Sequence, residues 1–416
     1  MLFFQEIFYE NPKLLKKNLP TFINSKEELK KNIKKKTFGF LKDIFKKDYK
    51  EINKFSSKLK KFQTILFLGT GGSSLGGKTL ISLIEKQKKK NKAEIIFIEN
   101  IDQSSITEIL EGIDLNRTGL MVVSKSGETL ETLSQYFFVT EFMKRQEIDL
   151  KGRIHILTEN KNSTLKKIQE SNKYAFISHD KKIGGRYSIF SNVGLIPASV
   201  YGLKIKSICE GGKNFIKQLS MNEFEKFDQI FLPAFYKYSL LRQNTNINVF
   251  MPYIDKMQNF SFWLRQLWAE SVGKSGKGST LVNALGTVDQ HSQLQLYLDG
   301  PKDKFFTIIY KKEIEEKSDI LKCKIGKGQT FDTLRNKSMK KLLAAEVYAT
   351  IDTLQKKDLP VTSILIKKIN EETIGSLLMY FFLETILFCY MLEVEPFDQP
   401  AVEEGKILTK EKLKNE

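Results

Sequence analysis

The chain has few of the residues that build disulfide frameworks and metal clusters. Its 416 residues include three cysteines and three histidines. The cysteines, Cys209, Cys323 and Cys389, are widely spaced and odd in number, whereas a disulfide scaffold or a zinc site needs paired or closely spaced ligands. We therefore expect a reduced, cytoplasmic location and no metal site.

The sequence also lacks a long uninterrupted apolar run. The longest candidate, Ile374–Leu392, is broken by Glu384, and a membrane span needs roughly 18 or more apolar residues. The first residues, Met1–Phe8, have neither the basic segment nor the small-residue cleavage site of an export signal. We expect a buried core helix at 374–392, and neither export nor a membrane partner.

Lysine dominates the charge, and the formal net charge is +18. The excess is scattered over the segments Lys30–Lys36, Lys86–Lys92 and Lys410–Lys414. Nucleic-acid binders instead gather basic residues on one face, often interleaved with aromatic ones. We therefore expect no nucleic-acid partner, although a basic surface would still attract an anionic substrate.

Apolar strand candidates alternate with helical stretches in two series, which predicts an α/β fold with two doubly wound parallel sheets. The expected strands are Ile65–Leu68, Glu94–Glu99, Leu120–Ser124, Arg153–Thr158 and Tyr174–Ile177, then Asn246–Met251, Phe305–Tyr310 and Thr362–Ile366. Long helices are expected near 256–270, 331–356 and 371–392, with a helical link near 205–225.

Four segments follow from this pattern. Apolar residues at helical spacing, such as Phe38, Leu41 and Phe45, predict a helical N-terminal arm over residues 1–60. The two α/β domains are expected at 61–205 and 206–395, with a C-terminal tail at 396–416. Ligands of such domains are expected at the carboxyl ends of the strands.

The first motif at such a place is the glycine-rich turn Gly69–Gly76, which follows the strand Ile65–Leu68. Glycines allow a tight turn and a close approach of the backbone to an anion. A dinucleotide site is the alternative, with Glu99 in the position of the ribose-binding acid. The third glycine of that fingerprint would stand at position 74, which is Ser74, and this disfavours a nicotinamide cofactor.

The second motif is Ser124–Thr132, again a strand end that runs into a helix. Ser126, Thr129 and Thr132 are three residues apart, so we expect their hydroxyls to line one helical face together with Ser124. With the free N–H groups of the first helical turn, they suit a phosphate. The glutamates of the motif are expected to face away. Ordinary helix capping is the alternative, and the absence of a Gly-Lys-Ser/Thr ending excludes a nucleotide P-loop.

The third motif, Ile183–Gly194, presents Arg186 on two glycines just before a helix expected near Ser188. A guanidinium fixed in this way can stabilise an anion, because its charge is permanent and its donors are oriented. A structural salt bridge is the alternative. Further along, Glu270 lies on an apolar helical face about twenty residues before His291, a possible acid/base couple. Alternatively, His291 is a structural residue.

These segments resemble the glucose-6-phosphate isomerase (phosphoglucose isomerase) family in its shorter bacterial form. Six motifs carry the resemblance in order between about residues 65 and 406: Gly-Thr-Gly-Gly-Ser at 69, Ser-Lys-Ser-Gly-Glu-Thr-Leu-Glu-Thr at 124, Gly-Gly-Arg-Tyr-Ser at 184, Glu-Ser-x-Gly-Lys at 270, Gly-Thr-x-x-Gln-His-Ser at 286, and Phe-Asp-Gln at 397 with Lys406. The resemblance implies two sugar-isomerase (SIS-type) domains in an αβα arrangement, a homodimer, and interconversion of glucose 6-phosphate and fructose 6-phosphate without metal or cofactor.

The resemblance also implies roles for single residues. Glu270 would move the proton between C1 and C2, and Arg186 would stabilise the enediolate. His291 would open the sugar ring, reaching the site from the partner subunit, and Lys406, seven residues after Gln399, would assist at the ring oxygen. The substrate-binding positions implied are Gly72, Ser73, Ser124, Lys125, Ser126, Thr129, Thr132, Gln266 and Gln399.

Two departures from the family pattern, Pro400 and the pair Lys181–Lys182, predict altered local loop geometry. A non-catalytic sugar-phosphate sensor of the same fold is the alternative function, but a sensor has no need for an acid/base set. An amino-sugar synthase would need an N-terminal cysteine, which Met1–Glu10 lacks. Acceptance of mannose 6-phosphate stays open.

Overall fold

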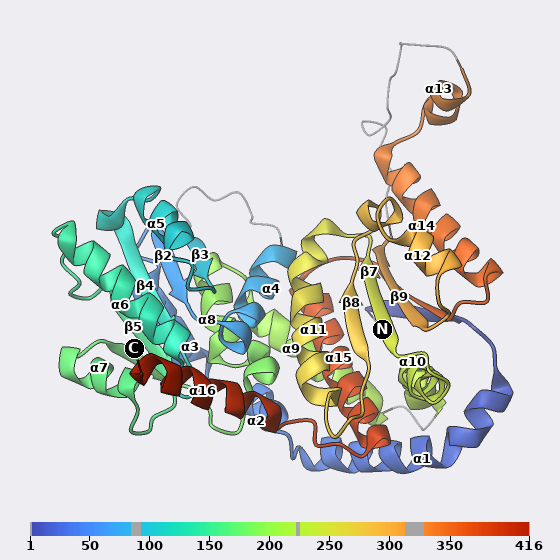
Figure 1. The fold of residues 1–416 in the computed structure, drawn as a ribbon, viewed down its shortest axis with the longest axis horizontal. Coiled ribbons are helices and arrows are strands. Elements are labelled where there is room, and N and C mark those ends of the chain that lie inside the picture. Colours follow the sequence, from blue (N-terminus) through green and yellow to red (C-terminus); the bar gives the residue numbers. More distant parts are fainter. Residues whose placement is uncertain (1, 85–92, 222–224, 313–327, 416) are drawn as a thin grey trace.

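The computed structural model describes residues 2–84, 93–221, 225–312 and 328–415. Cys323 and the lysine run at 86–92 lie outside these residues. Two five-stranded sheets stand side by side with helices on their faces (Figure 1). The predicted α/β fold with two sheets in an αβα arrangement is therefore confirmed, while the domain limits stay a prediction.

The first sheet is entirely parallel and has the order β3-β2-β4-β5-β6. Counted within the sheet, this is the doubly wound order 2-1-3-4-5, which places a ligand crevice where the order reverses, between β2 and β4. All five predicted strands of this sheet are present: β2 (Thr64–Leu68), β3 (Glu94–Ile98), β4 (Thr118–Val123), β5 (Ile154–Thr158) and β6 (Ala175–Ser178). Its helices are α4 (Leu75–Leu83), α5 (Gln103–Glu111), α6 (Leu130–Arg145), α7 (Thr164–Asn172) and α8 (Asn192–Tyr201).

The second sheet has the order β1-β10-β9-β7-β8, so its four parallel strands repeat the arrangement of the first sheet. The predicted strands are β7 (Ile247–Pro252), β9 (Lys304–Lys311) and β10 (Val361–Ile366), and the sequence reading missed β8 (Thr280–Asn283). The prediction of a wholly helical N-terminal arm is wrong at β1 (Phe3–Phe8), which pairs antiparallel with β10. Its partner strand lies at the other end of the sequence, so no local pattern marks this edge strand.

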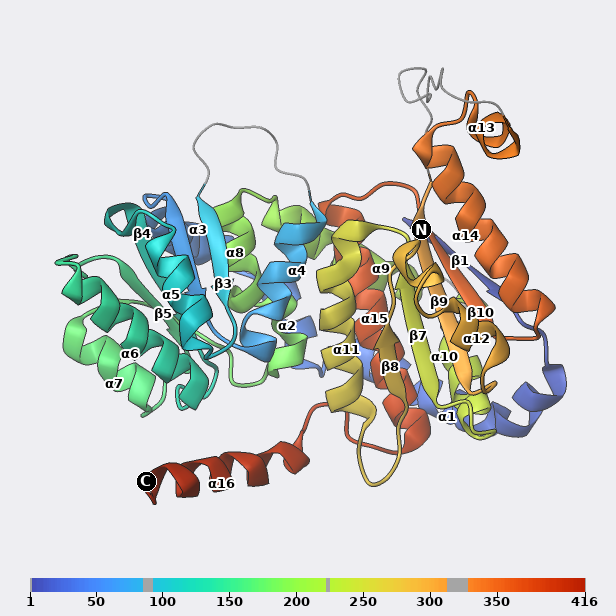
Figure 2. The ribbon, with the colours of Figure 1, turned by 45° about the horizontal axis from the view of Figure 1, so that its top comes forward.

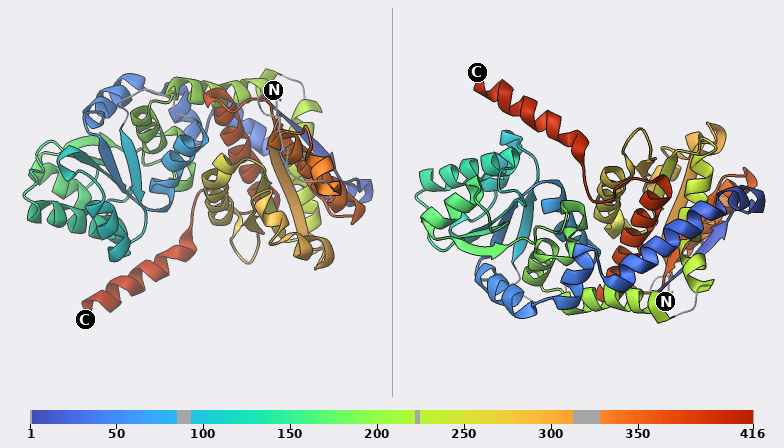
Figure 3. Two further views of the ribbon diagram at one scale, coloured as in Figure 1. Left: turned by 90° about the horizontal axis from the view of Figure 1, so that it is seen from above. Right: turned by 90° about the horizontal axis from the view of Figure 1, so that it is seen from below.

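The rest of the N-terminal arm is helical, with α1 (Pro12–Lys35), α2 (Gly39–Lys46) and α3 (Tyr49–Leu59). Helix α1 runs along the second domain, whereas α3 packs against α8 of the first (Figure 1). The C-terminal tail contains a helix, α16 (Glu403–Lys414), whose residues are all exposed. It extends away from the body of the molecule (Figures 2 and 3).

Helix α15 (Glu371–Leu392) is the predicted core helix. Among the described residues it is the one helix with the length and apolar composition of a membrane span, and 94% of that apolar window is buried within the fold. It packs closely on α9 (Ile205–Met221) through glycine: a Cβ on Gly375 would lie 1.9 Å from the carbonyl oxygen of Ile208. This close approach seats α15 in the largest apolar core.

The two faces of the second sheet carry different helices. Phe250 and Ile309 face the core that contains α15 and α11 (Gln258–Val272), whereas Val249 and Ile308 face α12 (Leu294–Asp299) and α14 (Met339–Lys356). The remaining helices are α10 (Glu225–Leu241), which was not predicted, and α13 (Gln329–Leu334), which the predicted helix at 331–356 merged with α14. Helix α11 also packs on α4 of the first domain, so it lies between the two sheets.

Candidate active site

The loop after β2 joins the parts of the candidate site. Its glycines have no room for side chains: a Cβ on Gly72 would lie 2.4 Å from the backbone of Gly185, and one on Gly71 would lie 3.1 Å from Nε2 of Gln266. Ser188 Oγ also donates to the carbonyl of Gly72 at 3.0 Å. The β2 loop therefore meets the arginine motif through the backbone of Gly185 and α11 through the side chain of Gln266.

Glu99, the acid that a dinucleotide site would use, binds other side chains of the protein. Glu99 accepts a hydrogen bond from Ser74 Oγ at 2.6 Å and pairs with Lys78. Ser74 in turn donates its backbone N–H to the carbonyl of Gly71 at 3.1 Å. Glu99 therefore stabilises the β2 loop, which is a different role from holding a ribose.

The hydroxyls of the second motif gather at the adjacent strand end. Ser124 Oγ lies 2.8 Å from Thr129 Oγ1, and Ser126 Oγ lies 3.4 Å from the same atom. The expectation that Ser126 and Thr129 lie on a helical face is wrong, because α6 begins only at Leu130. The left-handed backbone of Gly127 (φ +72°) keeps the chain out of the helix at this point. The hydroxyls still converge, but within a loop.

Thr132, in the first turn of α6, has an unpartnered donor. Its side chain is buried, and within the described residues Oγ1 has no hydrogen-bond partner. A buried hydroxyl without a partner is costly unless a ligand or water satisfies it. Glu128 faces away as predicted, since it accepts hydrogen bonds from Thr164 N at 2.6 Å and Thr164 Oγ1 at 2.9 Å. The loop thus presents hydroxyls and helix N–H groups, an arrangement suited to a phosphate.

Lys125 adds positive charge to this loop. Its ammonium lies 3.9 Å from Glu159. Burial lowers the pKa of Lys125, and the like charge of Arg186 adds to the lowering. The loop of residues 124–129, called the hydroxyl loop below, therefore carries one lysine whose charge Glu159 partly offsets.

Arg186 is buried and uses all five of its N–H donors. It lies within a short 3-10 helix (Gly185–Phe190), and α8 follows only at Asn192. Its Nε donates to Ser271 Oγ at 2.9 Å, and Nη2 donates to the carbonyls of Pro396 at 2.7 Å and Asp398 at 2.8 Å. Its Nη1 is 3.2 Å from Glu270 Oε2 and 2.8 Å from Gln399 Oε1. Of the two interpretations of Arg186, the salt bridge is present as an ion pair with Glu270, and the role as an anion stabiliser stays a prediction.

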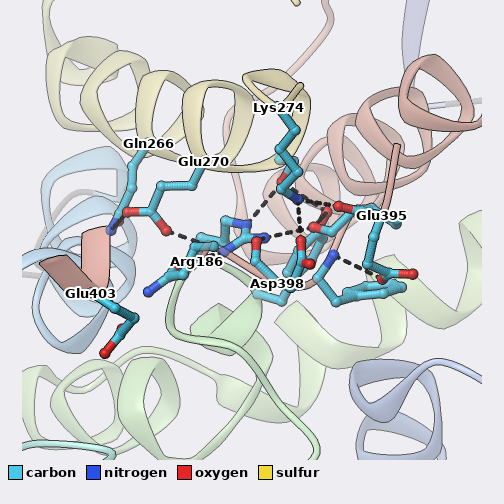
Figure 4. A network of polar contacts seen from close by, with 12 residues as sticks. Arg186, Gln266, Glu270, Lys274, Glu395, Asp398 and Glu403 are labelled. Carbon is cyan, nitrogen blue, oxygen red and sulfur yellow. Dashed lines mark hydrogen bonds and ion pairs between the residues drawn. The ribbon is translucent and has the colours of Figure 1, made fainter. Parts of the chain in front are cut away.

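The second oxygen of Glu270 is also held. Gln266, one helical turn earlier on α11, donates from Nε2 to Glu270 Oε1 at 2.8 Å (Figure 4). The Glu270 side chain keeps 29% of its surface exposed. It also borders a pocket of about 510 Å³ between the end of α11 and residues 393–402. A carboxylate that is oriented from both sides and still accessible is suited to move a proton.

His291 and Lys406 do not join this group within one chain. His291 is exposed and lies between β8 and α12, where Tyr297 and Leu294 pack on the α14 side of the sheet, away from α11. Lys406 is exposed on α16, and its Nζ donates to Glu403 Oε1 at 2.7 Å.

Several site residues were not predicted. Ser271 and the carbonyls of Pro396 and Asp398 bind Arg186, and Lys274 pairs with Asp398 at 2.8 Å. Lys274 could have been found from its place in the Glu-Ser-x-Gly-Lys motif, but backbone carbonyls leave no mark in a sequence. Gln399, the residue before Pro400, accepts a hydrogen bond from Arg186 Nη1 at 2.8 Å.

Comparisons with known proteins show the family to which the chain belongs. A family model, phosphoglucose isomerase, matches residues 31–416. A probable glucose-6-phosphate isomerase of Methanococcus maripaludis is 33% identical over 404 residues, 95% of this chain and 89% of the relative. A glucose-6-phosphate isomerase of Campylobacter jejuni is 32% identical over 84% of each chain.

Solved structures extend the comparison to the fold. A hypothetical protein from Thermus thermophilus superposes with a TM-score of 0.83 at 25% identity, over 97% of both chains. A glucose-6-phosphate isomerase from Chlamydia trachomatis has a TM-score of 0.72 at 21% identity, over 90% of this chain and 73% of the other. The chain therefore has the same fold as the Chlamydia trachomatis protein.

Proposed function

The chain belongs to the phosphoglucose isomerase family, and we propose that the group around Glu270 is where it interconverts glucose 6-phosphate and fructose 6-phosphate. The enzyme is an aldose–ketose isomerase of glycolysis and gluconeogenesis. The observation that carries the assignment of the site is the Glu270 carboxylate, which Gln266 and Arg186 orient while it stays partly open.

Glu270 acts as the base. Isomerisation removes a weakly acidic C–H proton beside a carbonyl and returns it to the neighbouring carbon. The carboxylate takes the proton from C2 of the open-chain aldose, which leaves an enediolate. After the hydroxyl proton on O2 has moved to O1, the carboxylate delivers its proton to C1. A positioned base contributes roughly 10²- to 10⁴-fold to such a step. The hydrogen bond from Gln266 Nε2 at 2.8 Å fixes its direction.

Arg186 supplies a permanent positive charge next to the base. Because its five donors are engaged by the protein, it acts on the enediolate through the field of its charge and keeps the Glu270 carboxylate in place. A buried guanidinium in a site that excludes water stabilises developing negative charge more strongly than one in solvent.

The hydroxyl loop binds the phosphate. Ser124, Ser126 and Thr129 surround the start of α6, and Thr132 offers an unpartnered hydroxyl. Lys125 adds charge, and Gly72 and Ser73 contact the sugar. The phosphate is remote from the reacting carbons, so its binding energy can hold C1 and C2 against Glu270.

A homodimer completes the site with His291 from the partner chain. The support is that His291 is exposed and flanked by exposed apolar residues, Val288 at 60% and Leu296 at 53%, which favours an interface at this surface. The pocket beside Glu270 has room for a group from another chain. Lys406 acts at the ring oxygen, and Val402, one turn before it, lines that pocket.

The test is a coupled assay that follows conversion of fructose 6-phosphate to glucose 6-phosphate in excess EDTA. We expect turnover with metal chelated, because the proposed steps are proton transfers by side chains. The alternative, a non-catalytic sugar-phosphate sensor, predicts binding of fructose 6-phosphate without turnover. A parallel rate measurement with mannose 6-phosphate decides whether that sugar is accepted. A cytoplasmic location without a nucleic-acid or membrane partner is part of the proposal, supported by the scarcity of cysteine and the scattered lysines.

A further inference from the structure

The loop of residues 395–399 determines how Arg186 is held. Two of its carbonyls, those of Pro396 and Asp398, accept from Nη2, and Gln399 Oε1 accepts from Nη1. The loop connects α15 to α16 without helix or strand of its own. Its position therefore depends on the side chains that anchor it.

Lys274 is a charged anchor of this loop. Its Nζ lies 2.8 Å from Asp398 Oδ1 and also donates to the carbonyl of Glu395, so it grips the loop at two points (Figure 4). The Lys274 side chain is 10% exposed and the Asp398 side chain is 54% exposed, so solvent screens the ion pair on the Asp398 side. The largely buried ammonium also donates to the carbonyl of Glu395, which gives it a second, charge-assisted contact with the loop. Phe397, between the two contact points, packs on Tyr187 at 5.0 Å between ring centroids.

The geometry points to Lys274 as a positioning residue for the isomerisation, which acts through the 395–399 loop on Arg186 and through Arg186 on Glu270. This inference rests on the proposed function. Glu270 lies in the last turn of α11, and Lys274 lies two residues beyond the end of this helix at Val272. The segment that carries Glu270 therefore also anchors the 395–399 loop, which in turn holds Arg186. The contacts run from Glu270 to Arg186, from Arg186 to the loop, and from the loop to Lys274, which is close to Glu270 in the sequence.

Lys277 provides a matched control on the same turn. Its Nζ donates to the carbonyl of Leu392 at 2.8 Å and lies 3.8 Å from Glu393. It therefore contacts the end of α15 but none of the groups that bind Arg186. Its side chain is 45% exposed, and replacing it removes a lysine from this turn without releasing the 395–399 loop.

The experiment compares Lys274→Met, Lys274→Arg and Lys277→Met with the wild-type enzyme on fructose 6-phosphate. For Lys274→Met we expect kcat to fall by roughly 10- to 100-fold, since a small displacement of a catalytic group is enough for such a loss. We expect KM to stay within about threefold, because the phosphate contacts lie on a different loop. Lys274→Arg should recover most of kcat, and Lys277→Met should stay within about twofold of wild type.

A second measurement separates positioning from general destabilisation. With glucose 6-phosphate deuterated at C2, the isotope effect on kcat should be larger in Lys274→Met than in wild type, because proton transfer becomes the slow step. If Lys274→Met does not fold, Asp398→Asn removes the ion pair and keeps the backbone carbonyl, and it should lower kcat in the same direction.

The inference is overturned if kcat of Lys274→Met stays within twofold of wild type, if KM rises as much as kcat falls, or if arginine restores no more activity than methionine. An unchanged isotope effect also overturns it. Failure of the proposed function looks different, because the wild-type chain would then show no turnover of fructose 6-phosphate in the same assay.

Discussion

Arg186 Nη1 lies 3.2 Å from Glu270 Oε2, in a contact where the guanidinium has no donor left over. The carboxylate thus has a fixed direction before any substrate arrives. Such preorganisation lowers the barrier because no rearrangement is needed at the moment of reaction. It also makes the base sensitive to every group that holds the arginine.

Glu270→Gln should abolish most turnover without abolishing binding. The amide cannot accept the C2 proton, so kcat should fall by roughly 10²- to 10⁴-fold. KM should change little, because the phosphate contacts are untouched. The coupled assay measures both values. The control is Glu108→Gln, an exposed carboxylate on α5, which should leave both unchanged; turnover of Glu270→Gln at the wild-type level would remove Glu270 from the mechanism.

Arg186→Lys should lower both stability and activity. A lysine has three donors on a point charge and cannot reproduce five planar ones, so the carbonyls of Pro396 and Asp398 would lose a partner. We expect the free energy of unfolding to fall by about 1–3 kcal/mol and kcat to fall by roughly 10²- to 10³-fold. Urea unfolding and the coupled assay measure the two effects, and a variant with unchanged unfolding would contradict the contact network.

Thr132→Val separates phosphate binding from folding. Because Thr132 Oγ1 has no protein partner within the described residues, its removal should leave the midpoint of thermal unfolding unchanged or higher. A lost hydrogen bond to a charged phosphate is worth about 1.5–3 kcal/mol, so KM should rise by roughly 10- to 100-fold.

The matched variant is Ser124→Ala. Ser124 Oγ accepts from Gly127 N at 3.1 Å and contacts Thr129 at 2.8 Å, so this change should cost about 1 kcal/mol of stability as well as affinity. If Thr132→Val destabilised the fold as much as Ser124→Ala while KM stayed constant, the hydroxyl of Thr132 would not face the phosphate.

The sequence predicted the parallel core because its strands are short apolar runs that end in glycine or serine, such as Thr64–Leu68 before Gly69. It missed β1, since Phe3 pairs with Ile366 from the far end of the chain. It also placed the hydroxyls of Ser126 and Thr129 on a helix, because residue spacing carries no information on the left-handed Gly127. A local hydrophobic pattern therefore predicts the core strands and helices. It does not predict an edge strand that pairs with a distant segment, or the backbone conformation of a loop.

The residues of the candidate site also fall into those that the sequence predicted and those that it did not. Glu270, Gln266 and Arg186 were found from motifs, and the structure places them in contact. The carbonyls of Pro396 and Asp398, which lie 210 and 212 residues from Arg186, could not be found, since every residue type has a carbonyl. That His291 makes no contact with Glu270 within one chain could not be predicted either, because it depends on the path of the chain after β8.

Two buried histidines make stability fall in mild acid. Burial lowers the pKa of His155 and of His179 to about 4, below the value near 6.5 of an unfolded chain. The unfolded state therefore binds more protons between pH 6.5 and 4, and stability is full above this window and is lost as pH falls through it. The loss is on the order of 3 kcal/mol for each histidine.

Urea unfolding between pH 7 and pH 4 measures this loss. His155 is packed edge-on against Phe55, and His155→Gln removes its titration while keeping a polar side chain. The variant should be less stable at pH 7, yet its stability should fall less steeply toward pH 4. Parallel curves for variant and wild type would show that folding does not change the pKa of His155.

Mixed dimers test whether His291 serves the partner chain. Glu270→Gln and His291→Ala chains are each expected to be inactive as homodimers. In a heterodimer, one of the two sites would combine the intact Glu270 of one chain with the intact His291 of the other, so about half of the wild-type activity per active heterodimer should return. Co-expression with two different affinity tags isolates the heterodimer, and the coupled assay measures its turnover.

The outcome depends on the side of the sheet to which His291 belongs. Within one chain the neighbouring Gln290 donates to Thr350 of α14, whereas Glu270 lies on α11, which packs on the opposite face of the sheet. Heterodimers that stay inactive despite confirmed mixing would place both residues in the site of one chain. A Glu270→Gln, His291→Ala double variant mixed with wild type is the control. Its heterodimer leaves each site with only one of the two residues and should be inactive, which separates true complementation from residual activity.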